Sequence, residues 1–361
     1  MKIALLEPYA VSSHLRWANE WKQHSVHEIE IFSLPARHWK WRMHGAAITL
    51  SELLITSGFK ADVIVCTDMM DLAFAKSILI GKCPNCRFIL YVHENQFAYP
   101  FSERDSDKRE IRDQHYAFIN YSSAYSADEI WFNSEYNKRS MLSALPAYLK
   151  RFPDFSNLQT IQVIEQKSRV MYPGIDQKYF NLSAGKMEHD KPIVLWNHRW
   201  EYDKNPSAFF EALLTISEKG ISFQVNVVGE SFESYPTEFD EYKKKLAKHI
   251  RNWGFVEDHE EYLNVLYESD IIAVTSNQEF FGYSVLEAIA AGLTPLLPNR
   301  LVYPEHLSDP RFFYSQHDEF VEKLTNLITS KNRNTEAATA VKKKYLLKER
   351  VQHYDLVIST I

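Results

Sequence analysis

Short apolar runs alternate with longer amphipathic stretches along the whole chain, in two successive series. The first series has its apolar runs at Ile3–Leu6, Ile29–Phe32, Val63–Cys66, Phe88–Val92, Ile130–Phe132 and Val170–Met171, and the second at Ile193–Trp196, Phe223–Val228, Asn252–Phe255, Ile271–Thr275 and Thr294–Leu297. This alternation indicates buried parallel strands that are joined by crossover helices. The sequence therefore predicts an α/β protein built from two doubly wound, Rossmann-like sheets.

A polar stretch without apolar periodicity, Asn181–Lys191, separates the two series. We place the domain boundary there, with an N-terminal domain over residues 1–182 and a C-terminal domain over residues 183–340. The segment Thr335–Val357 has a helical pattern, and we expect residues 341–361 to form a C-terminal helix that packs back towards the N-terminal domain. Two domains of this kind face each other across a cleft, and ligands bind outside the carboxyl ends of the strands.

The overall composition is that of a globular protein that needs no cross-links. The chain has 361 residues, 45% of them hydrophobic and 24% charged, and its formal net charge is −6. That charge argues against non-specific nucleic-acid binding as the main function, because such binding needs many phosphate contacts from Lys and Arg. A local basic patch remains compatible with it.

The small number of cysteines and the lack of membrane-targeting signals favour the cytoplasm as the compartment. Three cysteines in a chain of this length suit a reducing environment. Cys83 and Cys86 have C-x-x-C spacing but no second pair, which favours a turn before the next strand over a zinc or redox site. No apolar stretch reaches the ~18–20 residues of a membrane span, and the first residues enter a strand without a signal peptide. We therefore expect a cytoplasmic protein with no membrane contact.

The segment Gln278–Ala288 follows the apolar run Ile271–Thr275 and opens a helix. Its two acids, Glu279 and Glu287, lie about two helical turns apart. Amides around Gly282 would point out of the helix N-terminus and form a seat for an anion, and the Glu287 carboxylate could bind the two hydroxyls of a ribose. The alternative is structural, with Glu279 as a helix N-terminal acid and Glu287 on a solvated helix face.

The segment Trp196–Pro206 lies at the end of the first strand of the second domain. It carries Arg199 and Lys204 on either side of a turn. Two cations at a strand end can hold a diphosphate. The alternative is that they form surface ion pairs with Glu201 and Asp203.

Two further polar stretches follow strands of the first domain. His93, in the run His93–Gln96, could hydrogen-bond a reacting sugar or transfer a proton, or it is a satisfied interior histidine. The stretch Arg37–His44 interleaves basic side chains with tryptophans, which suits the phosphates and bases of nucleic acid. Its alternative is a helix entry whose tryptophans are buried.

Motifs that mark several other chemistries are missing from the chain. There is no H-E-x-x-H and no zinc-finger spacing, so we expect no metal. G-x-G-x-x-G and G-x-S-x-G are also absent, which argues against nicotinamide chemistry and against the usual hydrolase elbow.

These features together resemble a known family. The two-domain layout with Glu279 and Glu287 resembles the retaining glycosyltransferases of family 4, which have the GT-B fold. Five stretches are similar to one group within it, the tRNA-queuosine alpha-mannosyltransferases, and they are spread over nearly the whole chain. They are LPARHWKWR (34–42), YVHENQFAYP (91–100), FNSEYNKRSML (132–142), NHRWEYDKNP (197–206) and EFFGYSVLEA (279–288).

The resemblance implies a donor, GDP-mannose, and an acceptor, queuosine in the anticodon loop of a tRNA. In the implied donor site, Glu287 holds the ribose, Glu279 holds the sugar hydroxyls, and Arg199 and Lys204 hold the diphosphate. The full donor set is Arg199, Lys204, Glu279, Phe280, Phe281, Gly282 and Glu287. Glu279, Arg199 and Lys204 are also expected to be catalytic, and His93 joins them beside the transferred sugar.

The acceptor site is expected on the first domain. The residues after the fourth strand, Glu94 and Asn95, would contact the acceptor there. Arg37, Lys40 and Arg42 are our candidates for the patch that binds tRNA, because an acidic protein needs a local cluster of cations to hold RNA.

One loop departs from the family pattern. The first loop of these enzymes usually holds a glycine pair that lets the backbone meet the diphosphate. Here the loop is Glu7–His14, and Val11 and Ser12 stand where the pair would be. The hydroxyls of Ser12 or Ser13 could take its place.

No second pair of carboxylates places a nucleophile beneath the sugar. We therefore expect retention through a same-face, oxocarbenium-like path, with no metal and no cofactor besides the donor. Two other functions stay open at this stage. One is a related transferase that acts on a lipid or glycan, and the other is a non-catalytic protein that binds sugar nucleotides or RNA.

Overall fold

The computed structural model describes residues 1–98, 114–183, 189–231, 235–330 and 336–360. These residues form two compact units, one of Met1–Gly174 with Leu347–Ile361 and the other of Ile175–Leu346. The sequence had placed the boundaries at 182/183 and 340/341. In the structure the second unit begins earlier and ends later than that.

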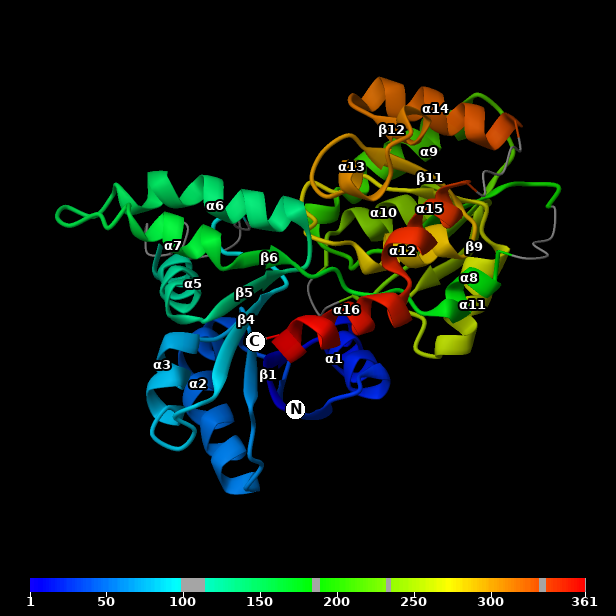
Figure 1. Ribbon diagram of the computed structural model, residues 1–361. Helices are drawn as coiled ribbons and strands as arrows, with labels where there is room; N and C mark the ends of the chain where they lie inside the picture. The colour runs from blue at the N-terminus through cyan, green and yellow to red at the C-terminus, as the bar shows by residue number, and fades with distance from the viewer. Residues whose placement is uncertain (99–113, 184–188, 232–234, 331–335, 361) are drawn as a thin grey trace. The chain divides into compact units, whose positions relative to one another are not determined.

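The first unit contains a six-stranded parallel sheet with the strand order β2-β1-β3-β4-β5-β6. The strands are β1 (Lys2–Ala10), β2 (Glu28–Pro35), β3 (Val63–Thr67), β4 (Arg87–Val92), β5 (Glu129–Phe132) and β6 (Ser168–Val170). The helices are α1 (Ser12–His24), α2 (Trp39–Ser57), α3 (Leu72–Leu79), α5 (Gln114–Ser126), α6 (Glu135–Leu149), α7 (Thr160–Gln166) and α16 (Leu347–Thr360). Helices α2, α3 and α5 pack together, and α1 packs with α16 (Figure 1).

The second unit also contains a six-stranded parallel sheet, with the order β12-β11-β10-β7-β8-β9. The strands are β7 (Ile193–Trp196), β8 (Gln224–Val228), β9 (Ile250–Gly254), β10 (Ile271–Ala273), β11 (Thr294–Pro298) and β12 (Phe313–Tyr314). The helices are α8 (Gln177–Asn181), α9 (Pro206–Glu218), α10 (Glu238–Lys245), α11 (His259–Glu268), α12 (Tyr283–Ala290), α13 (Tyr303–His306), α14 (His317–Ser330) and α15 (Glu336–Tyr345), with 3₁₀ turns η1 (Tyr202–Lys204) and η2 (Pro310–Phe312).

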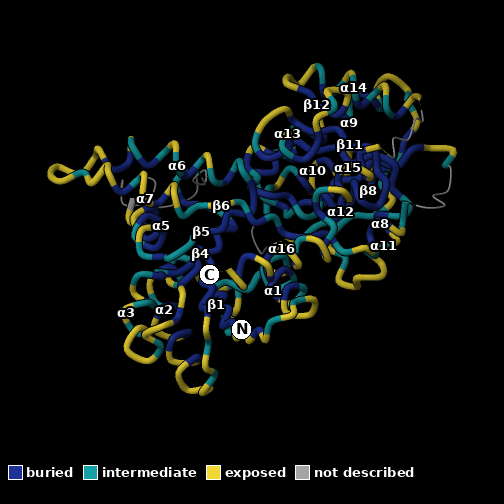
Figure 2. Tube along the Cα trace, in the orientation of Figure 1, coloured by how far each residue is buried: buried dark blue, intermediate teal, exposed yellow. Residues whose placement is uncertain are grey.

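Every apolar run that the sequence marked as a strand forms one, which confirms the two doubly wound α/β sheets. Each sheet is buried on both faces, and each unit has its own hydrophobic core (Figure 2). The helix expected over Glu110–Ser126 is described from Gln114 onwards, and residues 110–113 lie outside the described part of the chain.

The single helix expected over Thr335–Val357 is wrong. The segment forms two helices, α15 and α16, that are interrupted at Leu346, which forms a parallel bridge with Ile175. The backbone N–H of Ile175 donates to the carbonyl of Tyr345 at 2.7 Å. The helical pattern continues across Leu346, but this long-range backbone pairing ends the first helix there.

Helix α16 belongs to the first unit. The Tyr354 hydroxyl accepts from Trp17 Nε1 at 3.3 Å and donates to the carbonyl of Tyr172 at 2.9 Å. The Asp355 carboxylate accepts from Ser25 Oγ at 2.6 Å and from the Val26 N–H at 2.8 Å. The end of the chain therefore covers the face of the sheet on which α1 lies.

Candidate functional site

The strand order fixes where each unit can bind a ligand. In the first unit the order reverses between β1 and β3, and in the second between β7 and β10. In open parallel sheets the loops diverge at such a reversal, and ligands bind there, at the carboxyl ends of the strands. Most of the candidate site residues from the sequence analysis follow these strands. Each unit therefore has its own group of candidate residues, and we call each group a half-site.

In the second unit, Lys204 joins the two loops at the reversal. Its side chain is only 8% exposed, and its Nζ donates to the Gln278 carbonyl at 2.9 Å and to Glu279 Oε2 at 3.3 Å. The same Nζ lies 3.2 Å from Asp203 Oδ2. Thr275 Oγ1 donates to the carbonyl of Lys204 at 3.0 Å. The loop after β7 and the loop after β10 are therefore held together by one buried cation and its partners.

The charges of this pair are stabilised against burial. Burial alone would lower the pKa of Lys204, but Glu279 and Asp203 outweigh it and raise that pKa. Burial would raise the pKa of Glu279, yet Lys204, His198 and the Phe281 N–H lower it. Both groups are thus ionised at neutral pH.

Glu287 is buried, with 3% of the residue exposed, so it does not lie on a solvated helix face. Its Oε2 accepts from the Tyr262 hydroxyl at 3.1 Å, and that hydroxyl accepts from Asn197 Nδ2 at 3.0 Å. Asn197 Nδ2 also donates to the Ser284 carbonyl at 2.8 Å. Through Asn197, the second acid is tied to the loop that carries Lys204.

The turn before α12 presents its backbone at this edge. Gly282 is the N-cap, and its φ of 76° is a left-handed conformation that suits glycine. Glu279 Oε1 accepts from the N–H groups of Phe280 and Phe281 at 3.1 and 3.3 Å. The expectation of a helix N-terminal acid at Glu279 thus also describes its geometry, alongside the ion pair with Lys204.

Arg199 and His198 flank the same loop. Arg199 lies 3.2 Å from Glu201 Oε2 with its side chain 39% exposed, so the ion pair that the sequence offered as an alternative is present. Burial lowers the pKa of His198 to about 3, with Lys204 adding to the shift. His198 is therefore a neutral imidazole beside the Lys204–Glu279 pair.

In the first unit, His93 is buried at the end of β4 and stacks on His14. The two ring centroids lie 3.9 Å apart with 12° between the planes, and Trp17 packs edge-on at 4.8 Å. Burial, followed by the neighbouring His14, lowers the pKa of His93 well below its usual value. His93 Nε2 has no hydrogen-bond partner among the described residues, which does not fit a satisfied interior histidine.

Three carboxylates surround these rings. Glu7 Oε1 lies 3.6 Å from His14 Nδ1, and Asp68 Oδ1 accepts from the His93 N–H at 2.7 Å. Burial, then the charge of Glu94, raises the pKa of Asp68 well above its usual value. Glu7, His14 and His93 also bring one potential metal-ligand atom each within 4.8 Å of the others.

Asn95 is fully buried, and its amide is used within the protein. Its Nδ2 donates to Asn137 Oδ1 at 2.8 Å and to Ser140 Oγ at 2.9 Å, while its Oδ1 accepts from the N–H groups of Phe97 and Ala98. The structure thus gives Asn95 the role of holding its loop, and we do not carry it forward as an acceptor contact.

The stretch Arg37–His44 is a helix entry, since α2 begins at Trp39. Trp39 packs on Tyr116 with centroids 5.0 Å apart, but Trp41 remains 67% exposed. Arg37 is exposed, and Lys40 and Arg42 are half-buried. The stretch follows β2, so it lies at the same edge of the sheet as His93.

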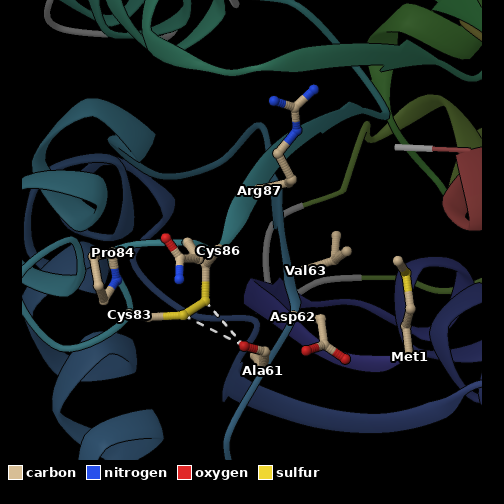
Figure 3. A pocket seen from close by; sticks show the side chains of 9 residues that line it. Met1, Ala61, Asp62, Val63, Cys83, Pro84, Cys86 and Arg87 are labelled. Atoms are coloured by element: carbon tan, nitrogen blue, oxygen red, sulfur yellow. Dashed lines mark hydrogen bonds between the residues drawn. A yellow bond between two sulfur atoms is a disulfide. The ribbon is translucent and has the colours of Figure 1, made fainter.

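Cys83 and Cys86 lie in the turn before β4 and are joined as a disulfide. They line a surface pocket with Met1, Ala61, Asp62 and Arg87 (Figure 3). These residues lie at the amino ends of β1, β3 and β4, the opposite edge of the sheet from His93. That position does not suit the ligand of a doubly wound sheet.

Several residues of the half-sites escaped the sequence interpretation. Asp68 in the first unit and Tyr262 in the second are single residues without a motif around them. Glu7, His14 and His198 lie in stretches that the sequence singled out, but none of the three was selected as a site residue. The position of Asp68 at the end of the apolar run Val63–Cys66 was the one signal that could have selected it. Among the described residues, no helix is both long and apolar enough to cross a membrane.

Two family models match the chain: "tRNA-queuosine alpha-mannosyltransferase N-terminal" over residues 2–175 and "Glycosyl transferases group 1" over residues 181–344. A tRNA-queuosine alpha-mannosyltransferase of Drosophila melanogaster is 34% identical over 336 residues, which is 90% of this chain and 86% of the relative.

Solved glycosyltransferase structures share the fold. Anabaena Alr3699/HepE in complex with UDP aligns with a TM-score of 0.69 at 15% identity over 100% of both chains. A glycosyltransferase from Rickettsia africae aligns with a TM-score of 0.70 at 16% identity, over 99% of this chain and 97% of its own. At such identities the likeness concerns the fold alone, and it confirms the predicted GT-B architecture.

Proposed function

Because the chain belongs to the tRNA-queuosine alpha-mannosyltransferase family and is a glycosyltransferase, we propose that it transfers mannose from GDP-mannose to queuosine in a tRNA anticodon loop, with retention at the anomeric carbon. The observation that carries the proposal is the buried Lys204–Glu279 pair at the strand-order reversal of the second unit. This is where a doubly wound sheet binds its nucleotide ligand.

Lys204 and Arg199 stabilise the leaving diphosphate. Bond cleavage at the sugar leaves growing negative charge on the β-phosphate, and fixed positive charge in a site that excludes water lowers the barrier to that step. Lys204 is already charged and held by Glu279 and Asp203, so it needs little reorganisation. The amides at the start of α12 add the positive end of a helix dipole.

Glu279 and Glu287 bind the neutral parts of the donor. Glu287 is buried and Glu279 is half-buried, and a carboxylate accepts two hydrogen bonds from vicinal hydroxyls. Glu287 would take the ribose, with Tyr262 fixing its second oxygen, and Glu279 would take the sugar hydroxyls. His93, as a neutral imidazole, would bond the transferred mannose from the first unit.

The path we propose keeps attack and departure on one face of the sugar. The acceptor hydroxyl loses its proton to the leaving phosphate oxygen as the glycosidic bond forms, so no enzyme nucleophile is needed. Arg37, Lys40 and Arg42, beside the exposed Trp41, would hold the tRNA. We also propose that the enzyme works in the cytoplasm.

The test is direct incubation with GDP-mannose and tRNA that contains queuosine, followed by mass analysis of the nucleosides. We expect one hexose added to queuosine. Transfer to a lipid or glycan without RNA, or nucleotide binding without turnover, would replace this proposal with one of the two other functions.

A further inference from the structure

Glu7, Asp68 and Glu94 form a carboxylate cluster around the stacked rings of His14 and His93, at the strand-order reversal of the first unit. Glu7 and Asp68 are 0% and 2% exposed. Glu7 Oε2, Asp68 Oδ2, His14 Nδ1 and His93 Nε2 are buried, and each lacks a hydrogen-bond partner among the described residues, although His14 Nδ1 lies 3.6 Å from Glu7 Oε1. Buried polar atoms of a folded protein are nearly always paired, so four unpaired ones in one cluster indicate a ligand.

Carboxylates outnumber the cationic groups that act on Asp68. His14 lowers the pKa of Asp68, whereas Glu94 and Glu7 raise it. Burial would lower the pKa of His14, but Glu7, Asp68 and Glu94 outweigh burial and raise it, so these carboxylates favour the protonated form of His14. A buried carboxylate that lacks a counter-charge is costly, and a cationic ligand would remove that cost.

We propose that the carboxylate cluster binds the protonated secondary amine of queuosine, the nitrogen that links its cyclopentenediol to the deazapurine. The inference rests on the proposed function and adds a recognition element to it. Asp68 and Glu94 would accept charge-assisted hydrogen bonds from the two N–H groups of this ammonium. The amine lies a few bonds from the diol, so the cluster sits at the right place to hold the diol beside His93.

This contact explains how the enzyme would reject an unmodified anticodon. Guanosine has no amine at that position, and its binding would leave the buried Asp68 Oδ2 without a partner. Sites built around a hydrogen-bonding group of the substrate discriminate strongly against analogues that lack it. The selection for queuosine would therefore be made by charge as well as by shape.

The experiment is a cycle between one enzyme carboxylate and the substrate amine. Initial rates give KM for two acceptors, tRNA with native queuosine and the same tRNA acetylated on the amine, which removes the charge. Queuosine methylated on the amine keeps the charge and controls for bulk. The enzymes are the wild type, Asp68→Asn, which keeps an oxygen to accept the His93 N–H, and Glu52→Gln as an exposed control.

We expect acetylation to raise the acceptor KM of the wild type by about tenfold or more, the scale of a charged hydrogen bond. Asp68→Asn should raise the KM for native queuosine to a similar degree, and acetylation should then add little. Methylation and Glu52→Gln should change KM less than about twofold, and the KM for GDP-mannose should stay constant throughout. Should Asp68→Asn fold poorly, Glu94→Gln takes its place in the cycle.

Three results would overturn the inference. If acetylation raises the acceptor KM equally in the wild type, in Asp68→Asn and in Glu94→Gln, these carboxylates do not bind the amine. If the purified wild type contains a stoichiometric divalent metal, and Glu7→Gln lacks both this metal and activity, the cluster binds metal instead. If no hexosylated queuosine forms under any condition, the proposed function itself is rejected. If transfer occurs and the effects of acetylation and of the carboxylate substitution on the acceptor KM are additive, only the amine contact is rejected.

Discussion

Lys204 and Glu279 illustrate how single residues gain function from their surroundings. Each would tend to lose its charge on burial, and each keeps it because the other is 3.3 Å away. The sequence analysis identified both residues, each in a separate segment. It could not show that they are in contact, because Lys204 lies in the loop after β7 and Glu279 in the loop after β10, and these loops meet only in the folded sheet.

Glu287 and Tyr262 give a prediction at the level of one hydrogen bond. Tyr262→Phe removes the donor to Glu287 Oε2 and should raise the KM for GDP-mannose about threefold to tenfold while kcat changes little, since the ribose is remote from the reacting bond. Glu287→Ala should raise the same KM further. Steady-state kinetics with varied donor measure both, and an unchanged donor KM in Glu287→Ala contradicts the ribose assignment.

Residues without a local motif were the ones that sequence reasoning missed. Glu287 was found because it shares a helix start with Glu279. Glu7 and His14 lie in β1 and at the start of α1, whereas Asp68 follows β3 and His93 follows β4, and only the order of β1, β3 and β4 in the sheet brings these segments together. A pattern read along the chain contains no information on that order.

At the level of elements, α13 and α15 hold the turn before α12 in place. His306 donates its Nε2–H to the Phe281 carbonyl at 2.7 Å and accepts from the Tyr345 hydroxyl at 2.8 Å. The glycine-containing turn before α12 is thus fixed by a buried neutral imidazole. Protonation of that imidazole would remove its acceptor for Tyr345.

This arrangement predicts an acid-sensitive second unit. Burial lowers the pKa of His306 from 6.5 to about 4, so the unfolded chain binds a proton below pH 6.5 that the folded chain does not. Stability is therefore lost as the pH falls from 6.5 towards 4. Between pH 7 and pH 5 the loss from this group should be about 2 kcal/mol.

Urea unfolding at the two pH values measures that loss. The difference between pH 7 and pH 5 should shrink by about 2 kcal/mol in His306→Gln, whose side chain does not titrate. His27→Gln, on the other unit, serves as the control. An identical pH dependence in wild type and His306→Gln would show that the pKa of His306 is the same in the folded and the unfolded chain.

Long apolar strands were predictable and short or interrupted elements were not. β7 is apolar from end to end and β3 is apolar over Val63–Cys66, so their sequence alone identifies them. β12 has two residues and α13 has four, too few for any periodicity. The break between α15 and α16 depends on Ile175, which is distant in the sequence.

For the whole molecule, tRNA binding must overcome a net charge of −6. A complex held by a local basic patch should weaken steeply with salt. We expect a triple-alanine variant of Arg37, Lys40 and Arg42 to depend less on salt. The slope of log affinity for tRNA against log salt concentration should fall by about one for each phosphate that the variant no longer neutralises. Lys243, Lys244 and Lys245, exposed on α10, provide a matched triple-alanine control.

Filter binding or fluorescence titration over a range of salt gives this slope. The control variant should keep the wild-type slope. If the Arg37, Lys40 and Arg42 variant binds tRNA as the wild type does at every salt concentration, the tRNA contacts another surface.

A metal-free reaction is a prediction for the molecule as a whole. In the proposed mechanism Lys204 and Arg199 supply the charge that a divalent ion provides in metal-dependent transferases, so EDTA should leave the transfer rate within about twofold. The expectation that the chain lacks the D-x-D spacing of metal-dependent sugar transfer is wrong, because Asp105 and Asp107 have that spacing; they lie outside the described residues. Loss of activity in EDTA, restored by one divalent ion, would reject the metal-free path.

The most direct measurement is the single-turnover rate of mannose transfer from GDP-mannose to queuosine tRNA by Lys204→Ala, compared with the wild type and with Lys219→Ala, an exposed lysine after α9. Assays are run below the thermal transition of each variant. The account predicts a rate about 10²–10³ lower for Lys204→Ala, as for the loss of an oxyanion donor, and an unchanged rate for Lys219→Ala. A folded Lys204→Ala enzyme that transfers mannose at the wild-type rate would contradict it.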